Sequence, residues 1–505
     1  MPMPQASNGA MRPFIILWLG QSVSIIGSRM TTFALGVWLY KTYGSVTPLA
    51  LVAFASSIPS VVFSPIAGSI VDRWDRRKLL FISDGMRAFA SLAIILLLYF
   101  QHLRIWQIYL AQLVDGIFVV MAGVAQTAST SLLVPKSMLG RANGMLQASE
   151  ALSHVITPAL AGILLVRINL QGVMTVDFLT FFFSLAALAI VIIPNPRREA
   201  NIGQRLLQRV ITDTSTGWKY IRRHRGLWGL LLVSAFVNLL VTYVILLFQP
   251  MMLSFTSIKT MGMAMSISAS AMVIGSVVMS LWRGPKRNGL SMLGTILVCG
   301  PCIVMAGLRP SVLLVTISGF IFFSCLPVIN TCYEALWQRK VPLEIHGRVF
   351  GLRSLAAGSM WLVAQLTVGP LADHVFTPWF ATHSSIAGAI KSIIGAASGR
   401  SMGLFMSLVG MAWIAFALVA LAYAPLRNID SEIPDRMELG ESAGSEEPAL
   451  DPTDSQGASN LQQSGSRPEF SFCKAVRIPP SSAMYHYFLC FGEKSVRAAS
   501  WPAES

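Results

Sequence analysis

The stretch Val134-Pro135-Lys136-Ser137-Met138-Leu139-Gly140-Arg141-Ala142-Asn143-Gly144 occurs a second time, in altered form, as Val341-Pro342-Leu343-Glu344-Ile345-His346-Gly347-Arg348-Val349-Phe350-Gly351. Both copies read Val-Pro-x4-Gly-Arg-x-x-Gly, at an offset of 207 residues. The same offset places Arg76 on Arg283. A repeat at a constant distance indicates that the chain arose by duplication of one structural unit.

The chain on both sides of these stretches is strongly apolar. Of its 505 residues, 54% are hydrophobic and 12% are charged, and the mean hydropathy is +0.62. This composition does not suit a surface solvated by water. Segments of roughly 20 apolar residues, enough for a helix to cross about 30 Å of hydrocarbon, recur from Phe14 to Ala424. The sequence therefore predicts an all-α membrane protein.

Twelve membrane-spanning helices are predicted, six in each copy of the repeat. The first six cover about 14–38, 47–70, 79–100, 105–133, 142–166 and 172–193, and the second six cover about 227–252, 260–282, 288–308, 311–337, 347–372 and 402–424. The repeated stretches begin the fifth and eleventh helices. Because each copy has an even number of spans, both copies have the same orientation and are related by an axis along the membrane normal. The predicted architecture is two pseudo-symmetric six-helix bundles.

Basic residues are distributed unevenly between the connections. The formal net charge is +15, and basic runs at 72–78 and 222–225 alternate with connections that hold one or two basic residues, such as Lys41, Arg104, Arg167 and Lys259. This is the positive-inside pattern of membrane proteins and not the basic patch of a nucleic-acid-binding protein. We expect a multi-pass protein of the inner or plasma membrane of the cell, with both termini in the cytoplasm.

The chain divides into five predicted segments. These are a cytoplasmic N-terminus (1–13), the first bundle (14–193), a basic cytoplasmic linker (194–226), the second bundle (227–426) and a disordered cytoplasmic tail (427–505). No apolar segment with a cleavage site precedes the first span, so we expect no removable signal peptide. The six cysteines show no CxxC or Cys/His spacing, and we expect no metal site, disulfide framework or cofactor.

The connection between the second and third helices carries a known motif. Gly68-Ser69-Ile70-Val71-Asp72-Arg73-Trp74-Asp75-Arg76-Arg77-Lys78 resembles the G-x-x-x-D-R-x-x-R-R/K loop of the major facilitator superfamily. Gly68 would let its helix approach a neighbour closely, and the Asp72 carboxylate can accept hydrogen bonds from a helix N-terminus. The resemblance implies that the major facilitator fold is latched on its cytoplasmic side by this contact, through Gly68, Asp72, Arg73, Arg76, Arg77, Lys78, Arg141 and Arg348. The alternative is that the basic residues only determine topology.

Further stretches resemble the branch of this family that contains macrolide-efflux proteins and the enterobactin exporter. They cover roughly residues 12–427 and include Gly20-Gln21-Ser22, Phe33-Ala34-Leu35, Asp84 with Arg87, Arg141-Ala142-Asn143-Gly144 and Gly284-Pro285-Lys286-Arg287. The fourth helix departs from drug:proton antiporters, because Gln112-Leu113-Val114-Asp115-Gly116 has no arginine. Proton coupling is therefore implied by the branch and not by its usual residues.

The fifth helix carries a polar stripe. Gln147, Glu150, His154 and Pro158 follow one another at helical spacing, and Glu150 lies roughly 12 Å from the start of its helix at about 1.5 Å per residue. Polar groups within the bilayer are costly and so face the bundle interior or a watery cavity. We predict a protonation site at Glu150 and His154. The alternative is a hydrogen-bonded pair that fixes helix packing.

Other intramembrane polar residues are assigned by helical phase alone. In the seventh helix, Asn238, Thr242 and Gln249 are predicted either to line the cavity or to make interhelical hydrogen bonds. Asp115 and Gln126 share a face of the fourth helix, and Asp115 is predicted to pair with Arg29 of the first. Glu334 is predicted to act as a gate by pairing with Arg348 or Arg353, and Asp84 to neutralise Arg87 locally.

The residue patterns favour transport over catalysis. The sequence has no P-loop lysine motif, G-x-S-x-G or HExxH, so we expect no enzyme. The leading hypothesis is a monomeric secondary transporter that exports an amphipathic small molecule against protons, with lipid as its surroundings. One alternative is a carrier of lysophospholipid or another lipid. The other is a sensor or scaffold that acts through the tail.

Overall fold

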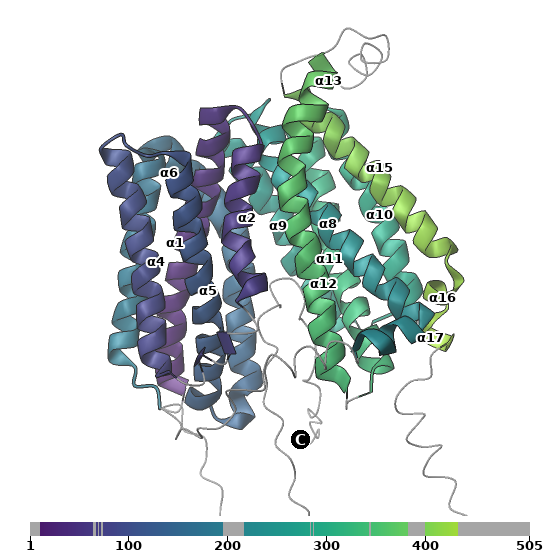
Figure 1. The fold of residues 1–505 in the computed structure, drawn as a ribbon, viewed down its shortest axis with the longest axis horizontal. Coiled ribbons are helices and arrows are strands. Elements are labelled where there is room, and N and C mark those ends of the chain that lie inside the picture. The colour runs from purple at the N-terminus through teal and green to yellow at the C-terminus, as the bar shows by residue number, and fades with distance from the viewer. Residues whose placement is uncertain are drawn as a thin grey trace, which may run out of the picture.

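The computed structural model describes residues 11–63, 67–68, 70–71, 74–194, 217–282, 284–285, 287–342, 345–381 and 399–432, and every regular element in these ranges is helical. The first half of the chain forms α1 (Arg12–Tyr43), α2 (Thr47–Val62), α4 (Arg76–Tyr99), α5 (Ile105–Leu133), η2 (Lys136–Met138) and α6 (Leu139–Ile190). The second half forms α8 (Arg225–Leu253), α9 (Ile258–Leu281), α10 (Asn288–Leu308), α11 (Val312–Lys340), α12 (His346–Pro370), η4 (Leu371–Phe376), α13 (Thr377–Ala381), α15 (Arg400–Ala422), α16 (Ala424–Arg427) and α17 (Ile429–Glu432). Figure 1 shows the two halves as bundles that stand side by side.

Ten helices of the described ranges are long and apolar enough to cross a membrane. One of them, α6, contains two predicted spans, and Asn169 interrupts its helical backbone with φ 56° and ψ −177°. A shorter apolar helix, α2, falls within a further predicted span. Within the described residues, each of the twelve predicted ranges overlaps a helix or one part of α6, and the all-α membrane fold is confirmed.

Side-chain caps begin several of these helices. The carboxylate of Asp75 accepts a hydrogen bond from the backbone N–H of Lys78 at the start of α4 (3.1 Å). The hydroxyl of Ser257 does the same for Thr260 at the start of α9 (3.2 Å). Each cap satisfies a backbone donor that has no partner within the helix. The sequence therefore sets the point at which the chain turns back into the membrane.

The repeated stretches adopt the same local structure. Val134 after α5 has φ −114° and ψ 131°, and Val341 after α11 has φ −106° and ψ 126°. In each copy the residue three places after the proline donates to the proline carbonyl, Met138 to Pro135 (2.8 Å) and Ile345 to Pro342 (3.3 Å). Equal backbone geometry at both places supports the duplication inferred from the sequence.

The bundle has two distinguishable ends. We call the end that carries the start of α4 and the helices α16 and α17 the basic end, because Arg76, Arg77, Lys78, Arg339, Lys340 and Arg427 lie there. The other end, which carries the α1–α2 turn and η4, is the opposite end. In Figure 1 the basic end is below and the opposite end above.

The two halves contact each other mainly through α6 with α9 and α2 with α12. The N–H of Ala159 donates to the Ser266 hydroxyl (2.9 Å), and the Gln365 amide donates to the Ser57 hydroxyl (3.0 Å). Gly262 of α9 lies against the Pro158 carbonyl so closely that a Cβ there would clash. Small residues permit such close contact between helices in a membrane. The seam is closed toward the opposite end.

The basic end is different. Cβ positions at Gly140, Gly144, Gly347 and Gly351, the glycines of the repeated stretches, have no heavy atom of the described chain within 4 Å beyond their immediate neighbours. In Figure 1 the helices of the two halves lie close together above and apart below. The described conformation is therefore closed at the opposite end and separated at the basic end.

Helical structure extends beyond two of the predicted segment boundaries. The predicted tail starts at 427, but α17 continues the packed chain to Glu432, and Ile429 is fully buried. The sequence gives no sign of this packing because the short segment lacks a long apolar run. Gly217–Arg223 of the predicted linker is helical and buries Ile221. The rest of the predicted linker's basic segment (195–216), the N-terminal ten residues and the tail beyond 432 lie outside the described residues.

Candidate functional site

The polar stripe of the fifth predicted helix meets a cation from α1. Arg29 Nη2 lies 2.5 Å from Glu150 Oε2, and Arg29 Nη1 lies 3.4 Å from His154 Nδ1. The side chains of Arg29 and Glu150 are 26% and 28% exposed, so both remain within reach of water. The structure thus brings three of the predicted site residues together. Protonation of Glu150 would remove the charge that holds Arg29.

The predicted pair between Asp115 and Arg29 is wrong. Asp115 of α5 accepts from Arg87 Nε of α4 at 2.9 Å, and Arg29 points at α6. Because α4 packs directly on α5, the guanidinium of Arg87 reaches Asp115 first. Asp84 lies 3.9 Å from Arg87, a looser contact than the local neutralisation predicted for these two residues.

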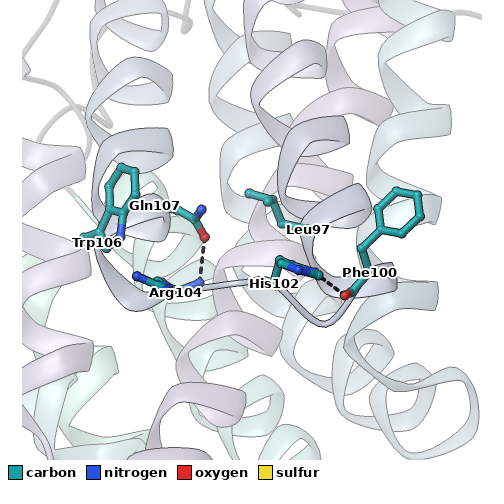
Figure 2. Close-up of a pocket in the computed structure, with 6 residues that line it drawn as sticks. All are labelled: Leu97, Phe100, His102, Arg104, Trp106 and Gln107. Carbon is teal, nitrogen blue, oxygen red and sulfur yellow. Dashed lines mark hydrogen bonds between the residues drawn. The ribbon is translucent and has the colours of Figure 1, made fainter.

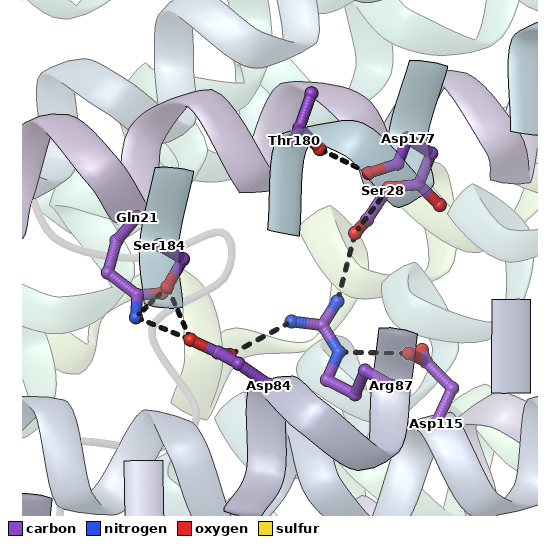
Figure 3. A network of polar contacts seen from close by, with 8 residues as sticks. All are labelled: Gln21, Ser28, Asp84, Arg87, Asp115, Asp177, Thr180 and Ser184. Atoms are coloured by element: carbon purple, nitrogen blue, oxygen red, sulfur yellow. Dashed lines mark hydrogen bonds and ion pairs between the residues drawn. The ribbon is translucent and has the colours of Figure 1, made fainter. Parts of the chain in front are cut away.

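Arg87 belongs to a larger polar network within the first half (Figure 3). Its Nη2 donates to the Ser28 hydroxyl (3.1 Å), which in turn donates to Asp177 of α6 (3.2 Å). Thr31 also donates to Asp177 (2.9 Å). Asp84 and Asp177 are buried in the membrane-spanning part, and the side chain of Arg87 is 11% exposed. Sequence reasoning missed Asp177, although a carboxylate inside a predicted span is itself a signal.

Asp84 anchors the other side of this network. Gln21 Nε2 of α1 donates to Asp84 Oδ2 (2.9 Å) and to the Ser184 hydroxyl (2.8 Å), and Ser184 also donates to Asp84. These bonds join α1, α4 and α6. Three carboxylates, those of Asp84, Asp115 and Asp177, therefore surround one guanidinium, and hydroxyl and amide donors stabilise the remaining negative charge.

The predicted residues of the seventh helix bond within their own helix. Asn238 donates to the Ser234 carbonyl (2.8 Å), and Thr242 donates to the Asn238 carbonyl (2.7 Å). Gln249 lies against Gly36 of α1, where its Oε1 would be 2.5 Å from a Cβ. Of these three residues, only Gln249 contacts the other half within the part of the chain that the structure describes. Gln126 and Gln147 are half-buried.

The loop motif acts differently from its predicted latch in this conformation. Arg76 donates to the Ala128 carbonyl (3.1 Å), and Arg77 donates to the carbonyls of Leu188 (2.8 Å) and Ala189 (2.6 Å). Cationic donors stabilise carbonyls near helix C-termini, so both arginines hold the loop against the first half. A Cβ at Gly68 meets no described heavy atom within 4 Å, so the predicted close approach is not made here.

The remaining predicted gate residues have different outcomes. Asp72 and Arg73 lie outside the described residues, and Lys78, Arg141 and Arg348 are exposed. Glu334 pairs with Arg353, one of its two predicted partners, through two hydrogen bonds of 2.6 and 3.0 Å. Both residues belong to the second half, on α11 and α12. The pair therefore fixes two helices of one bundle and does not cross the seam.

A surface cavity of about 530 Å³ lies at the opposite end (Figure 2). Its lining comes from the end of α4, the α4–α5 connection and the start of α5: Leu97, Phe100, His102, Arg104, Trp106 and Gln107. Phe100 and Trp106 are more than half exposed, as aromatic residues at a membrane interface often are. Because it lies around one connection and not between the halves, this cavity is not the substrate path.

The fold and this arrangement can be compared with known proteins. The family model of the Major Facilitator Superfamily matches residues 17–365. Macrolide efflux protein A of Streptococcus pyogenes is 28% identical over 73% of this chain and 91% of its own length. The enterobactin exporter EntS of Shigella flexneri is 24% identical over 67% of this chain and 80% of its own.

A solved structure of a bacterial homologue of the human lysosomal transporter Spinster, inward-facing and unoccupied, matches with a TM-score of 0.62 at 13% identity, over 85% of this chain and 99% of that one. At this identity the likeness shows the fold alone. The sequence matches confirm the predicted resemblance to the branch of macrolide-efflux proteins and the enterobactin exporter. Because the family model covers well over half of the 505 residues, the chain belongs to the major facilitator superfamily of membrane transporters.

Proposed function

We propose that the protein exports an amphipathic organic molecule in exchange for protons, by alternating access between its two halves. The observation that carries this proposal is the seam itself, closed at the opposite end through Ala159–Ser266 and Ser57–Gln365 and separated at the basic end. Two bundles that rock about a central site expose it to one side at a time. The printed names of the relatives, a macrolide efflux protein and an enterobactin exporter, support the outward direction.

The positive-inside rule assigns the two ends of the seam to the two sides of the membrane. The basic end carries the basic runs of the loops, whereas the connections at the opposite end hold one or two basic residues each, so the basic end is assigned to the cytoplasm. The first and last described helices both lead to that end, so both termini are cytoplasmic and the protein lies in the cell membrane. The described conformation is then the inward-facing one. The whole path forms between two halves of one chain, so a monomer is sufficient.

Glu150 is the proposed proton carrier. Its ion pair with Arg29 lies within the membrane-spanning region and is about one quarter exposed, so water from the separated end can deliver a proton. A protonated Glu150 no longer offers its negative charge to Arg29, which remains beside His154. Substrate release and proton uptake are linked because both change the interactions of the same cluster.

Transport by inverted membrane vesicles tests this proposal. A pH-sensitive dye should report proton movement when a macrolide or enterobactin is added, and Glu150→Gln should abolish this movement. Asp75→Asn, which removes a carboxylate from the loop outside the membrane, serves as the matched control and should keep it. The coupling is refuted if proton movement does not depend on substrate and export continues after the gradient is dissipated.

A further inference from the structure

The opposite end of the seam contains a carboxylate that no family motif assigns. Asp373 lies in the π-helical turn η4 that follows α12. Its Oδ1 accepts from the backbone N–H of Val46 (2.9 Å), and its Oδ2 accepts from the backbone N–H (2.7 Å) and the hydroxyl (2.6 Å) of Thr47. Three donors on the first turn of one half are thus bound by a single side chain of the other half.

This contact completes a helix that lacks its own cap. Val46 occupies the N-cap position of α2 and offers no side-chain hydrogen bond, and Pro48 follows within the first turn. The first N–H groups of a helix have no partner within it and carry partial positive charge. A carboxylate is the favoured acceptor for such groups, and hydrogen bonds to an ionised acceptor are stronger than neutral ones. Asp373 therefore acts as the N-cap of α2 from across the seam.

The backbone around Asp373 is built for this approach. Gly369 in the last turn of α12 lies so near α2 that a Cβ would be 2.6 Å from the Cα of Thr47. The π-helical turn then adds a residue to the helical repeat, which changes the direction of the side chains that follow. The two features together bring the carboxylate onto the helix N-terminus.

We infer that Asp373 is a latch residue that stabilises the form closed at the opposite end. Its bonds to Val46 and Thr47 must break when the two halves separate there, so they favour one conformation over the other. Asp373 is a positioning residue and does not need to touch substrate. The inference rests on the alternating access proposed above and extends it to a named contact.

Distance measurements between spin labels test the latch. In a background with the six native cysteines replaced by serine, Arg104→Cys and Arg309→Cys report the opposite end, and Lys136→Cys and Arg339→Cys report the basic end. All four positions are exposed, and the two positions of each pair lie in different halves of the chain. Full-length protein in lipid nanodiscs without substrate is compared with the Asp373→Asn variant, whose side chain keeps its size but loses its charge.

The expected result is a shift of about tenfold in the ratio of open to closed distances at the opposite end, from the loss of charge-assisted bonds. Asp430→Asn is the matched control, because Asp430 caps Gly289 of α10 (2.9 Å) within the second half. It removes the same kind of bond without crossing the seam and should leave both distances unchanged. Thr47→Val removes one of the three donors and should give a smaller shift in the same direction.

Two results would overturn the inference. One is that the distances between the spin labels at the opposite end have the same distribution in Asp373→Asn and Thr47→Val as in the unmodified protein. The other is an equal shift for Asp430→Asn, which would indicate general destabilisation. Neither measurement requires a proton gradient, so a failure of proton coupling would refute the proposed function and leave the latch standing.

Discussion

Replacing Glu334 with Gln is expected to destabilise the second half through the cation that it leaves behind. Glu334 and Arg353 are joined by hydrogen bonds of 2.6 and 3.0 Å, and their side chains are 10% and 8% exposed. At this burial, solvent screening is small. Removing one partner of a buried ion pair costs about 3–5 kcal/mol, because the other charge remains without compensation.

The reverse change, Arg353→Met, is expected to cost more. The guanidinium carbon of Arg353 also lies 4.5 Å from the ring centre of Phe350 and 5.1 Å from that of Tyr333. Each such contact contributes about 0.5–1 kcal/mol. The double variant Glu334→Gln/Arg353→Met carries neither charge of the pair, and its loss of unfolding free energy should stay below about 2 kcal/mol. The coupling energy between the two sites should therefore be at least about 4 kcal/mol.

Titration with a denaturing detergent in mixed micelles, followed by tryptophan fluorescence, gives the apparent free energies of unfolding for this cycle. Glu150→Gln provides a comparison, since the Arg29–Glu150 pair is more than one quarter exposed and should contribute less. Additive single-variant losses, or a single Glu334→Gln loss below about 1 kcal/mol, would contradict the assignment of this pair as a buried brace between α11 and α12.

Three further predictions use other parts of the fold. Arg400→Gln should lower the free energy of unfolding by about 2–4 kcal/mol, because the buried Arg400 donates to the carbonyls of Gly307 (3.0 Å) and Leu308 (2.7 Å) at the end of α10. The control is Arg309→Gln, which changes an exposed residue at the same helix end. Equal melting temperatures for the two variants would count against a capping role of Arg400. Gly262→Ala should force the seam apart at Pro158, at a steric cost of about 1–3 kcal/mol, and lower substrate export by roughly tenfold or more. The control variant Gly294→Ala has open space at its Cβ and should export normally. Ending the chain after Glu432 should leave export intact. A loss of export in this truncated protein would favour a scaffold that acts through the tail.

The fold was accessible from the sequence because its determinants are local and repeated. Apolar length sets each span, and the Val-Pro-x4-Gly-Arg-x-x-Gly stretch appears in the structure as the same backbone turn after α5 and α11. The end of the packed chain was less predictable. Ile429 and Asp430 belong to no long apolar segment, and their burial and capping contact depend on α10 far away in the sequence.

The polar sites were only partly predictable, for a geometric reason. Helical phase placed Glu150 and His154 on one face of α6, and the structure supplies Arg29 to both. Phase on a single helix does not say which neighbour it faces, so Asp115 was assigned to Arg29 when Arg87 was the nearer cation. Asp373 was missed because its role requires the N-terminus of α2, which lies in the other half.

The backbone of α6 also determines how the first half can move. Its two spans meet at Asn169 without an intervening loop, the only residue of this long helix with non-helical dihedral angles. The part before Asn169 forms the seam with α9 through Ala159, and the part after it packs on Gly20 of α1 through Ala187. A hairpin with so short a connection transmits displacement directly from one arm to the other. Any tilt at the seam must therefore carry α1 with it, as one rigid body.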